Sequence, residues 1–191
     1  MPIGQAKFGL LGGVADVLDL DNVNLIYSYD IAGTETSVDF LSTDISPDTY
    51  ENSFFVFNYV GTSIGQAYLD FSTDNCSSFT SNNYSYQSSR GTSASGTPTG
   101  DTSSTATYFE KLTYANTGDV AGIINISNMN ALETTRIQSI STAETGSNYS
   151  SIFYGGYVNS SNSEQYNSFR FGLASGTFDS GNLSVYSYVE S

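Results

Sequence analysis

Carboxylates are the side chains whose number in this sequence suggests acid–base chemistry. The chain of 191 residues has 19 Asp and Glu residues and no histidine. The lack of histidine excludes Ser-His-Asp and Cys-His nucleophiles, HExxH zinc sites and most transition-metal sites. Two carboxylates can hydrolyse a glycosidic bond, but no acid here has an identifiable partner that would orient it as a base. We therefore expect no enzymatic activity, with a glycosidase as the catalytic alternative.

Two short acidic stretches offer the oxygen ligands that calcium prefers. Asp19 and Asp21 lie in DLDN, and Asp70 and Asp74 lie in DFSTDN. Neither stretch has the glycine and the distal glutamate of an EF-hand loop, and aspartates in such stretches commonly cap turns. The sequence also has no GxxxxGK[ST] motif for nucleotide phosphates. We expect no cofactor and no metal, with calcium as the alternative for these aspartates.

The charge balance bears on the partners of the protein. The net charge is −14, and the five basic residues are scattered along the chain. No basic stripe can neutralise phosphates, so nucleic acid and anionic membrane surfaces are not expected partners. No apolar run approaches the length of a membrane span. The N-terminus lacks the features of a signal peptide, and Cys76 stands alone, so no intrachain disulfide is expected.

The composition is typical of an all-β protein. The chain contains 15 Tyr and 12 Phe, and Ser, Thr and Asn supply most of its polarity. Short strand-like runs recur between turn-forming residues, which indicates a β-sandwich or a barrel. We expect a jelly-roll-like antiparallel β-sandwich, with residues 88–104 as a long loop. The expected strands are 24–29, 37–41, 53–60, 67–72, 83–88, 105–114, 120–127, 135–141, 151–158, 168–175 and 183–189.

Residues 1–22 differ from the rest of the chain. They contain paired glycines and scattered aliphatics with no clean period. We interpret them as an extended N-terminal arm, followed by a sandwich domain over residues 23–191. The apolar side chains of the arm require another surface to cover them, and the alternative is that the arm packs back on its own domain.

Several expected strands are apolar on both faces. In SFFVFNYV (53–60), Phe54, Val56 and Val60 alternate with three aromatic residues, and in LSVYSYV (183–189) aliphatics alternate with tyrosines. Such a strand must be covered on both sides, by a loop, the arm or a neighbouring subunit. Tyrosine-rich faces favour a subunit interface. The expected contact residues are Phe8, Leu10, Leu11, Val14, Phe55, Phe57, Tyr59, Tyr186 and Tyr188.

Four stretches resemble a known class of viral proteins. The opening MPIGQAKFGLLGGVAD resembles the start of small virion proteins encoded by tailed phages, especially marine ones. The stretches SVDFLSTDISPDTYENSFFVFNYV and LDFSTDNCSSFTSNNYSYQSSRG resemble a β-sandwich module of phage structural and tail-associated proteins. The ending FRFGLASGTFDSGNLSVYSYVES resembles the terminal strand pair of that module, with Ser187 where glycine is common.

The resemblance implies a virion structural protein made in the cytoplasm of a bacterial host. The leading expectation is a decoration or cement protein on the capsid, a homo-oligomer and most simply a homotrimer, with the major capsid protein or other virion proteins as partners. The alternative is a tail-tip or fibre module that recognises host surface glycan. Tyr, Asn, Ser and Asp suit sugar binding, and the lack of Trp counts against it.

Overall fold

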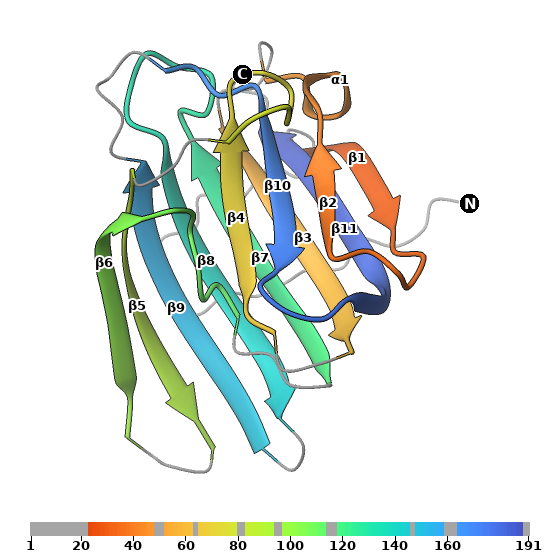
Figure 1. Ribbon diagram of the computed structural model, residues 1–191, viewed down its shortest axis with the longest axis vertical. Helices are drawn as coiled ribbons and strands as arrows, with labels where there is room; N and C mark the ends of the chain where they lie inside the picture. The colour runs from red at the N-terminus through yellow and green to blue at the C-terminus, as the bar shows by residue number, and fades with distance from the viewer. Residues whose placement is uncertain are drawn as a thin grey trace.

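The computed structural model describes residues 23–47, 52–62, 65–79, 83–93, 97–113, 118–145, 148–158 and 164–188. Apart from the four-residue helix α1 (Ser42–Ile45), its regular elements are β-strands (Figure 1). The strands are β1 (Val23–Asp30), β2 (Ser37–Phe40), β3 (Asn52–Gly61), β4 (Ala67–Ser72), β5 (Tyr84–Thr92), β6 (Thr99–Ala106), β7 (Asp119–Ser127), β8 (Arg136–Thr145), β9 (Asn148–Val158), β10 (Ser168–Leu173) and β11 (Phe178–Tyr188).

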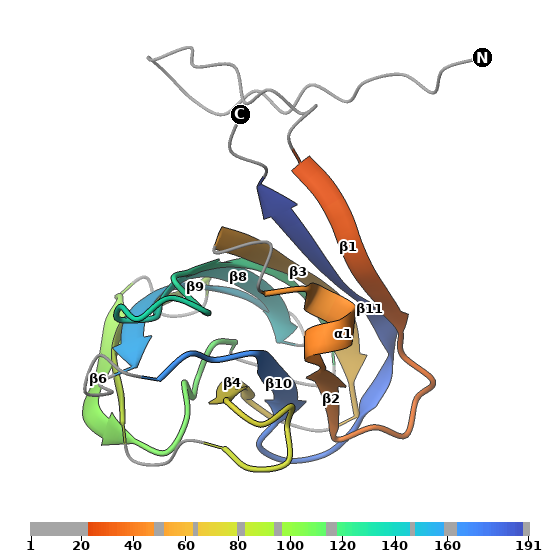
Figure 2. The ribbon, with the colours of Figure 1, turned by 90° about the horizontal axis from the view of Figure 1, so that it is seen from above.

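The strands form two antiparallel sheets that pack face to face. The large sheet has eight strands in the order β1-β11-β3-β7-β8-β9-β5-β6, and the small sheet has three in the order β2-β10-β4. Seen from above, the large sheet curves around the small one (Figure 2). The expected antiparallel β-sandwich is confirmed, with its strands divided unequally between the sheets.

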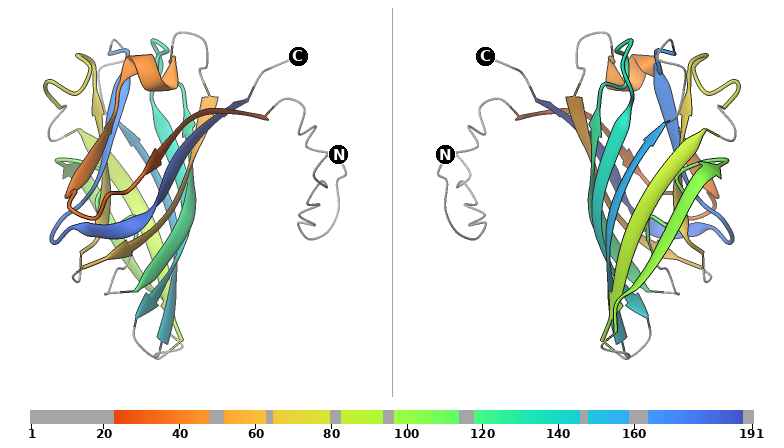
Figure 3. Two further views of the ribbon diagram at one scale, coloured as in Figure 1. Left: turned by 90° about the vertical axis from the view of Figure 1, so that its right-hand side faces the viewer. Right: turned by 90° about the vertical axis from the view of Figure 1, so that its left-hand side faces the viewer.

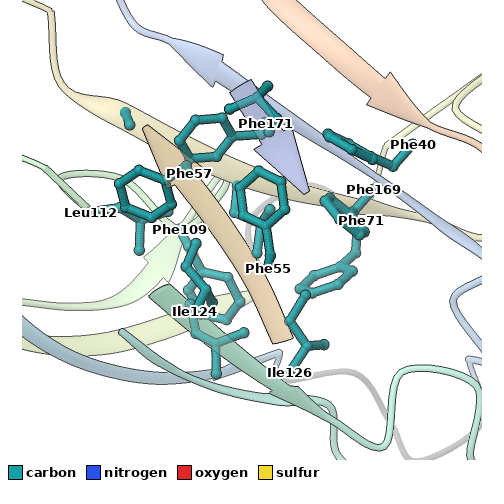
Figure 4. Close-up of a cluster of buried hydrophobic side chains, with 14 of the residues drawn as sticks. Phe40, Phe55, Phe57, Phe71, Phe109, Leu112, Ile124, Ile126, Phe169 and Phe171 are labelled. Atoms are coloured by element: carbon teal, nitrogen blue, oxygen red, sulfur yellow. The ribbon is translucent and has the colours of Figure 1, made fainter. Parts of the chain in front are cut away.

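The core between the sheets is dominated by aromatic rings. Every second residue of β3 points inward, so Phe55 and Phe57 meet Phe171 of β10, with ring centroids 4.9 and 5.1 Å apart (Figure 4). Phe40 of β2 stacks on Phe169 at 4.8 Å. All five of these rings are fully buried. Aromatic pairs at these distances stabilise the fold beyond the burial of their area.

Residues 107–113 close the outer edge of β4, where a strand over 105–114 was expected. Leu69 and Phe109 exchange two backbone hydrogen bonds of 3.0 and 2.9 Å as an isolated bridge. The Tyr84 hydroxyl accepts a hydrogen bond of 2.8 Å from the amide of Phe71. An uncovered strand edge invites pairing with another chain. The aromatic residues of 107–113 therefore cover the outer edge of β4. The expectation of a continuous strand over 105–114 was wrong.

The expected loop over 88–104 was also wrong, because most of it belongs to a hairpin. β5 continues to Thr92 and pairs with β6, so that Ser89 lies opposite Gly100 and Arg90 opposite Thr99. Backbone pairing needs no large apolar side chain, and threonine suits a strand. The lack of large apolar residues in 88–104 predicts that this hairpin is exposed to solvent. It does not exclude β-strands.

One corner of the large sheet extends beyond the small sheet. The first residue of β1, Val23, pairs with Tyr188 at the end of β11. Figures 2 and 3 both show these strand ends projecting away from the small sheet. Residues 1–22 join the domain at this corner, because they precede Val23 in the chain.

Candidate binding surface

The outer face of the large sheet carries a row of apolar side chains that crosses four strands. Val56, Ile123, Ile140 and Phe153 lie at matching positions of β3, β7, β8 and β9. Ile140 is 51% exposed and Phe153 is 58% exposed. Contiguous apolar side chains on a solvent-facing sheet indicate a surface that contacts another molecule.

A second group of apolar side chains, the edge ladder, lies at the projecting corner. It consists of Leu25, Tyr186 and Phe54, which are in register on β1, β11 and β3. The rings of Phe54 and Tyr186 are stacked, with centroids 4.9 Å apart and planes 5° from parallel. Leu25 at the end of the ladder is 56% exposed. Tyr186 therefore lies outside the core, where Phe54 covers one face of its ring.

A polar depression, the amide trough, lies on the same face, on strands away from the projecting corner. Gly155 forms its floor on β9, between Gln138 on β8 and Gln87 on β5. Asn125 and Thr102 continue the row on β7 and β6. The side chains that surround Gly155 line an open depression of about 660 Å³. In Figure 1 these strands follow one another from β6 at the left to β7.

Aromatic rings flank the floor of the amide trough along β9. Phe153 and Tyr157 lie two residues before and two residues after Gly155, so all three point to the same face. Tyr157 is 45% exposed. Arg136 is the charged residue among the side chains that line the hollow. The trough thus combines exposed rings and neutral amides with one cation.

Three of the expected contact residues lie inside the protein. Phe55, Phe57 and Tyr59 are fully buried between the two sheets, and the Tyr59 hydroxyl makes a hydrogen bond of 3.0 Å with Thr113. They form part of the core and cannot contact a neighbouring subunit, so their assignment to a contact surface is corrected. The alternate residues of β3, Phe54 and Val56, face outward instead.

The other expected contact residues divide into two groups. Tyr186 lies on the outer face as part of the edge ladder. The four residues of the arm and the side chain of Tyr188 lie outside the part of the chain that the structure describes. Those outside are Phe8, Leu10, Leu11, Val14 and Tyr188.

Arg170 connects neighbouring residues on the outer side of the small sheet. Arg170 of β10 lies between Asp39 of β2 and Asp70 of β4 in the strand register. Its guanidinium donates two hydrogen bonds, of 2.6 and 2.9 Å, to the Asp39 carboxylate, and it lies 4.2 Å from the centre of the Phe79 ring. These contacts tie neighbouring strands together and leave the arginine engaged on both sides.

Asp70 is a buried carboxyl group with one tyrosine partner. The Tyr84 hydroxyl donates a hydrogen bond of 2.7 Å to Asp70 Oδ1. Burial raises the pKa of Asp70 to about 6, because the charged form loses its hydration. The side chain is only 8% exposed. A raised carboxyl pKa is typical of a general acid, but this group is nearly inaccessible to a substrate.

Asp74 caps a turn after β4. Its carboxylate accepts hydrogen bonds from the hydroxyl and the amide of Ser78, at 2.6 and 2.7 Å, and from the hydroxyl of Ser72 at 2.8 Å. These bonds lower the pKa of Asp74 to about 2. Cys76 in the same turn is a half-buried free thiol. Among the described residues, no group of three or more His, Cys, Asp and Glu could hold a metal ion.

The amide trough was missed by the sequence analysis. Its residues come from five strands, and the trough exists only because their registers place Gln87, Gly155 and Gln138 side by side. One local signal was present in FYGGYV, where two aromatic residues with the same strand parity flank a glycine pair. A glycine inside a strand marks a bulge, a close packing contact or the approach of a ligand.

Comparison with known proteins gave no match to a family model, to a curated protein or to a solved structure. No helix in the described ranges has the length and apolarity that crossing a membrane requires.

Proposed function

We propose that the protein is a structural component of a phage particle, a capsid decoration or cement protein that acts through surface contacts. The resemblance of its N-terminus and strand pairs to phage virion proteins motivates this proposal. The observation that carries it is the edge ladder, an ordered apolar surface at the corner where residues 1–22 join the domain.

The edge ladder has the properties of a docking surface. Its stacked rings are already held in one arrangement by Phe54 and Tyr186, so little side-chain entropy is lost when a partner covers them. Burial of apolar surface contributes roughly 25 cal/mol per Å² before the costs of association. We propose that the edge ladder and residues 1–22 act together on one partner, the major capsid protein or another virion protein, in a homotrimer.

A binding experiment with particles tests this role of the edge ladder. Leu25→Glu places a charge on the ladder at a side chain that is 56% exposed, so the fold should tolerate it. Leu132→Glu is the matched control, because Leu132 is 63% exposed in a different part of the molecule, the connection between β7 and β8. Each purified variant is mixed with particles that lack the protein and is quantified after sedimentation.

The expected result is that Leu25→Glu weakens the affinity for the particles at least tenfold, since a buried unpaired carboxylate costs more than 1.4 kcal/mol. Leu132→Glu should bind like the wild type. Equal binding by all three proteins would rule out the edge ladder as the docking surface. Removal of residues 1–22 should leave a folded domain that does not join the particle.

The amide trough favours a second candidate, a tail-tip or fibre module that meets the host surface. Exposed rings beside amide donors and acceptors suit a ligand that has both apolar faces and polar groups. The two candidates differ in copy number, because a decoration protein covers the capsid and a tail-tip protein is present in few copies.

A further inference from the structure

The floor of the amide trough is a glycine that the fold itself does not require. A Cβ atom added at Gly155 would meet nothing within 4 Å. At the next residue, Gly156, an added Cβ would lie 2.6 Å from the ring of Phe109, so that glycine serves core packing. Glycine in a strand costs about 0.5–1 kcal/mol relative to alanine. A strand glycine with open space above it fits a place where a ligand approaches the backbone.

The amide side chains around Gly155 have unused hydrogen-bonding groups. Gln87, Asn125 and Gln138 are exposed on three different strands. Within the ranges that the structure describes, none of these three side chains has an intramolecular hydrogen-bond partner. Each amide offers two donor hydrogens and an acceptor oxygen. The trough therefore presents donors and acceptors side by side, as ligands rich in hydroxyl groups require.

The aromatic rings supply apolar surface beside these polar groups. Phe153 and Tyr157 are four residues apart along β9, which places their Cα atoms about 13 Å apart. A second hollow of about 290 Å³ continues from the trough toward Phe153, Ile123 and Ile140. The depression is thus elongated along β9, and an exposed ring stands near each end.

The chemistry of the lining selects among classes of ligand. Arg136 is the single charged residue of the lining, and the net charge of −14 repels anions. The lining contains no Asp, Glu, His or Cys, so it does not suit a metal ion. Its floor strand, β9, is paired on both sides, so a peptide cannot add to it as a further strand.

We propose that the amide trough binds a neutral glycan, a short stretch of oligosaccharide that lies along β9 over Gly155. Phe153 and Tyr157 stack on sugar rings, and Gln87, Gln138 and Asn125 hydrogen-bond to sugar hydroxyls. This inference develops the glycan-recognition alternative, and it does not depend on whether the protein sits on the capsid or on the tail.

Affinity electrophoresis of the full chain tests this inference. The protein is run in native gels that contain neutral polysaccharides, namely dextran, starch, xylan, galactomannan and β-glucan, and in gels that contain polygalacturonate or alginate. We expect retardation by at least one neutral polysaccharide. Retardation by none of them, or by the acidic polymers alone, would overturn the proposal.

Two variants change the trough, one by filling it and one by removing an amide. A third variant, at an amide outside the trough, is the matched control. Gly155→Leu places a side chain over the floor, where there is room for it. Gln138→Ala removes one amide from the trough. Asn58→Ala removes an exposed amide from the same face of the sheet, on β3, outside the residues that line the hollow. Thermal melts establish that all three variants are folded.

Gly155→Leu and Gln138→Ala should each weaken the binding of the retarding polysaccharide at least tenfold, and Asn58→Ala should leave it unchanged. Undiminished binding by Gly155→Leu, or equal losses in all three variants, would show that the trough is not the site. A protein that joins particles but is retarded by no neutral polysaccharide would leave the virion proposal intact and refute this one.

Discussion

Asp70 links the stability of the protein to pH. Its pKa in the folded protein is about 6, and a carboxyl group of this type titrates near 4 in an unfolded chain. Between about pH 4 and pH 6 the unfolded chain therefore loses its proton before the folded protein does. As the pH rises through this window, the buried Asp70 carboxyl lowers the free energy of unfolding, because ionisation is less favourable in the folded protein than in the unfolded chain. This loss of stability is fully present above pH 6.

Asp70→Asn should remove this cost, because the amide oxygen can still accept the hydrogen bond from Tyr84. We expect the variant to exceed the wild type in free energy of unfolding by about 1–3 kcal/mol at pH 8 and to match it near pH 4. Urea denaturation at a series of pH values measures the difference. A difference that stays constant from pH 4 to pH 8 would contradict the raised pKa. Hydrogen bonds from nearby amides and hydroxyls lower the pKa values of Glu35 and Asp74 to about 2, so these two groups titrate below this pH range.

Gly155 and Gly156 of β9 test which face of this strand packs against the core. Gly156→Ala forces a methyl group against the Phe109 ring, and a backbone oxygen of Ser85 lies 2.9 Å from the same position. Overpacking of this kind costs about 1–3 kcal/mol. Gly155→Ala meets open space and should leave the free energy of unfolding unchanged or slightly higher. Chemical denaturation of both variants distinguishes them, and equal losses would contradict the assignment of the two faces.

The strands of the large sheet differ in how many neighbours they pair with and in how many buried residues they contribute. β7 and β8 are paired on both sides within the large sheet, and buried residues alternate along them. β6 is an edge strand whose residues are exposed or half-buried. Amide protons exchange through local opening, which requires less free energy where few apolar contacts are broken.

Native-state hydrogen exchange should therefore separate these strands. We expect the paired amides of β7 and β8 to exchange only through nearly complete unfolding, and those of β6 to exchange at least a hundredfold faster. Exchange followed by NMR or by mass spectrometry of peptides provides the rates. Similar protection of amides from exchange in β6 and in β7 would mean that the β5–β6 hairpin unfolds together with the core.

The sequence pattern predicted strands where apolar residues alternate, as in SFRFGL of β10, whose Phe169 and Phe171 are buried. It failed for β6, because a Thr- and Ser-rich edge strand has no apolar alternation. It also failed near Phe109, where an aromatic residue belongs to a segment that crosses the edge of β4. Aromatic content alone does not distinguish a strand from a segment that packs over one.

The candidate surface was predicted only in part. Both faces of β3 are apolar, so the sequence cannot show which one meets the small sheet, and the inward face was assigned to the contact surface. Tyr186 was predicted to face a neighbouring subunit or the arm. It lies on the outer face, stacked on Phe54 of the same sheet, and its contact with a partner stays a prediction. The amide trough depends on the registers of five strands, which local sequence does not determine.

The two proposed roles use different parts of the outer face of the large sheet. The edge ladder lies on β1, β11 and β3, and the amide trough lies on β5 to β9. A protein docked by its projecting corner would leave the trough open to solvent. The two surfaces can therefore act at the same time, with one holding the particle and the other contacting glycan.

Quantitative mass spectrometry of purified particles tests the proposal that the chain is a structural part of a phage particle. Phage particles from a lysate in which the chain is expressed are banded by density, and peptides of the protein are counted against those of the major capsid protein. We expect a copy number comparable to that of the capsid protein. Absence of the chain from the banded particles would refute the virion proposal, and a few copies per particle would indicate a tail protein instead of a capsid decoration protein.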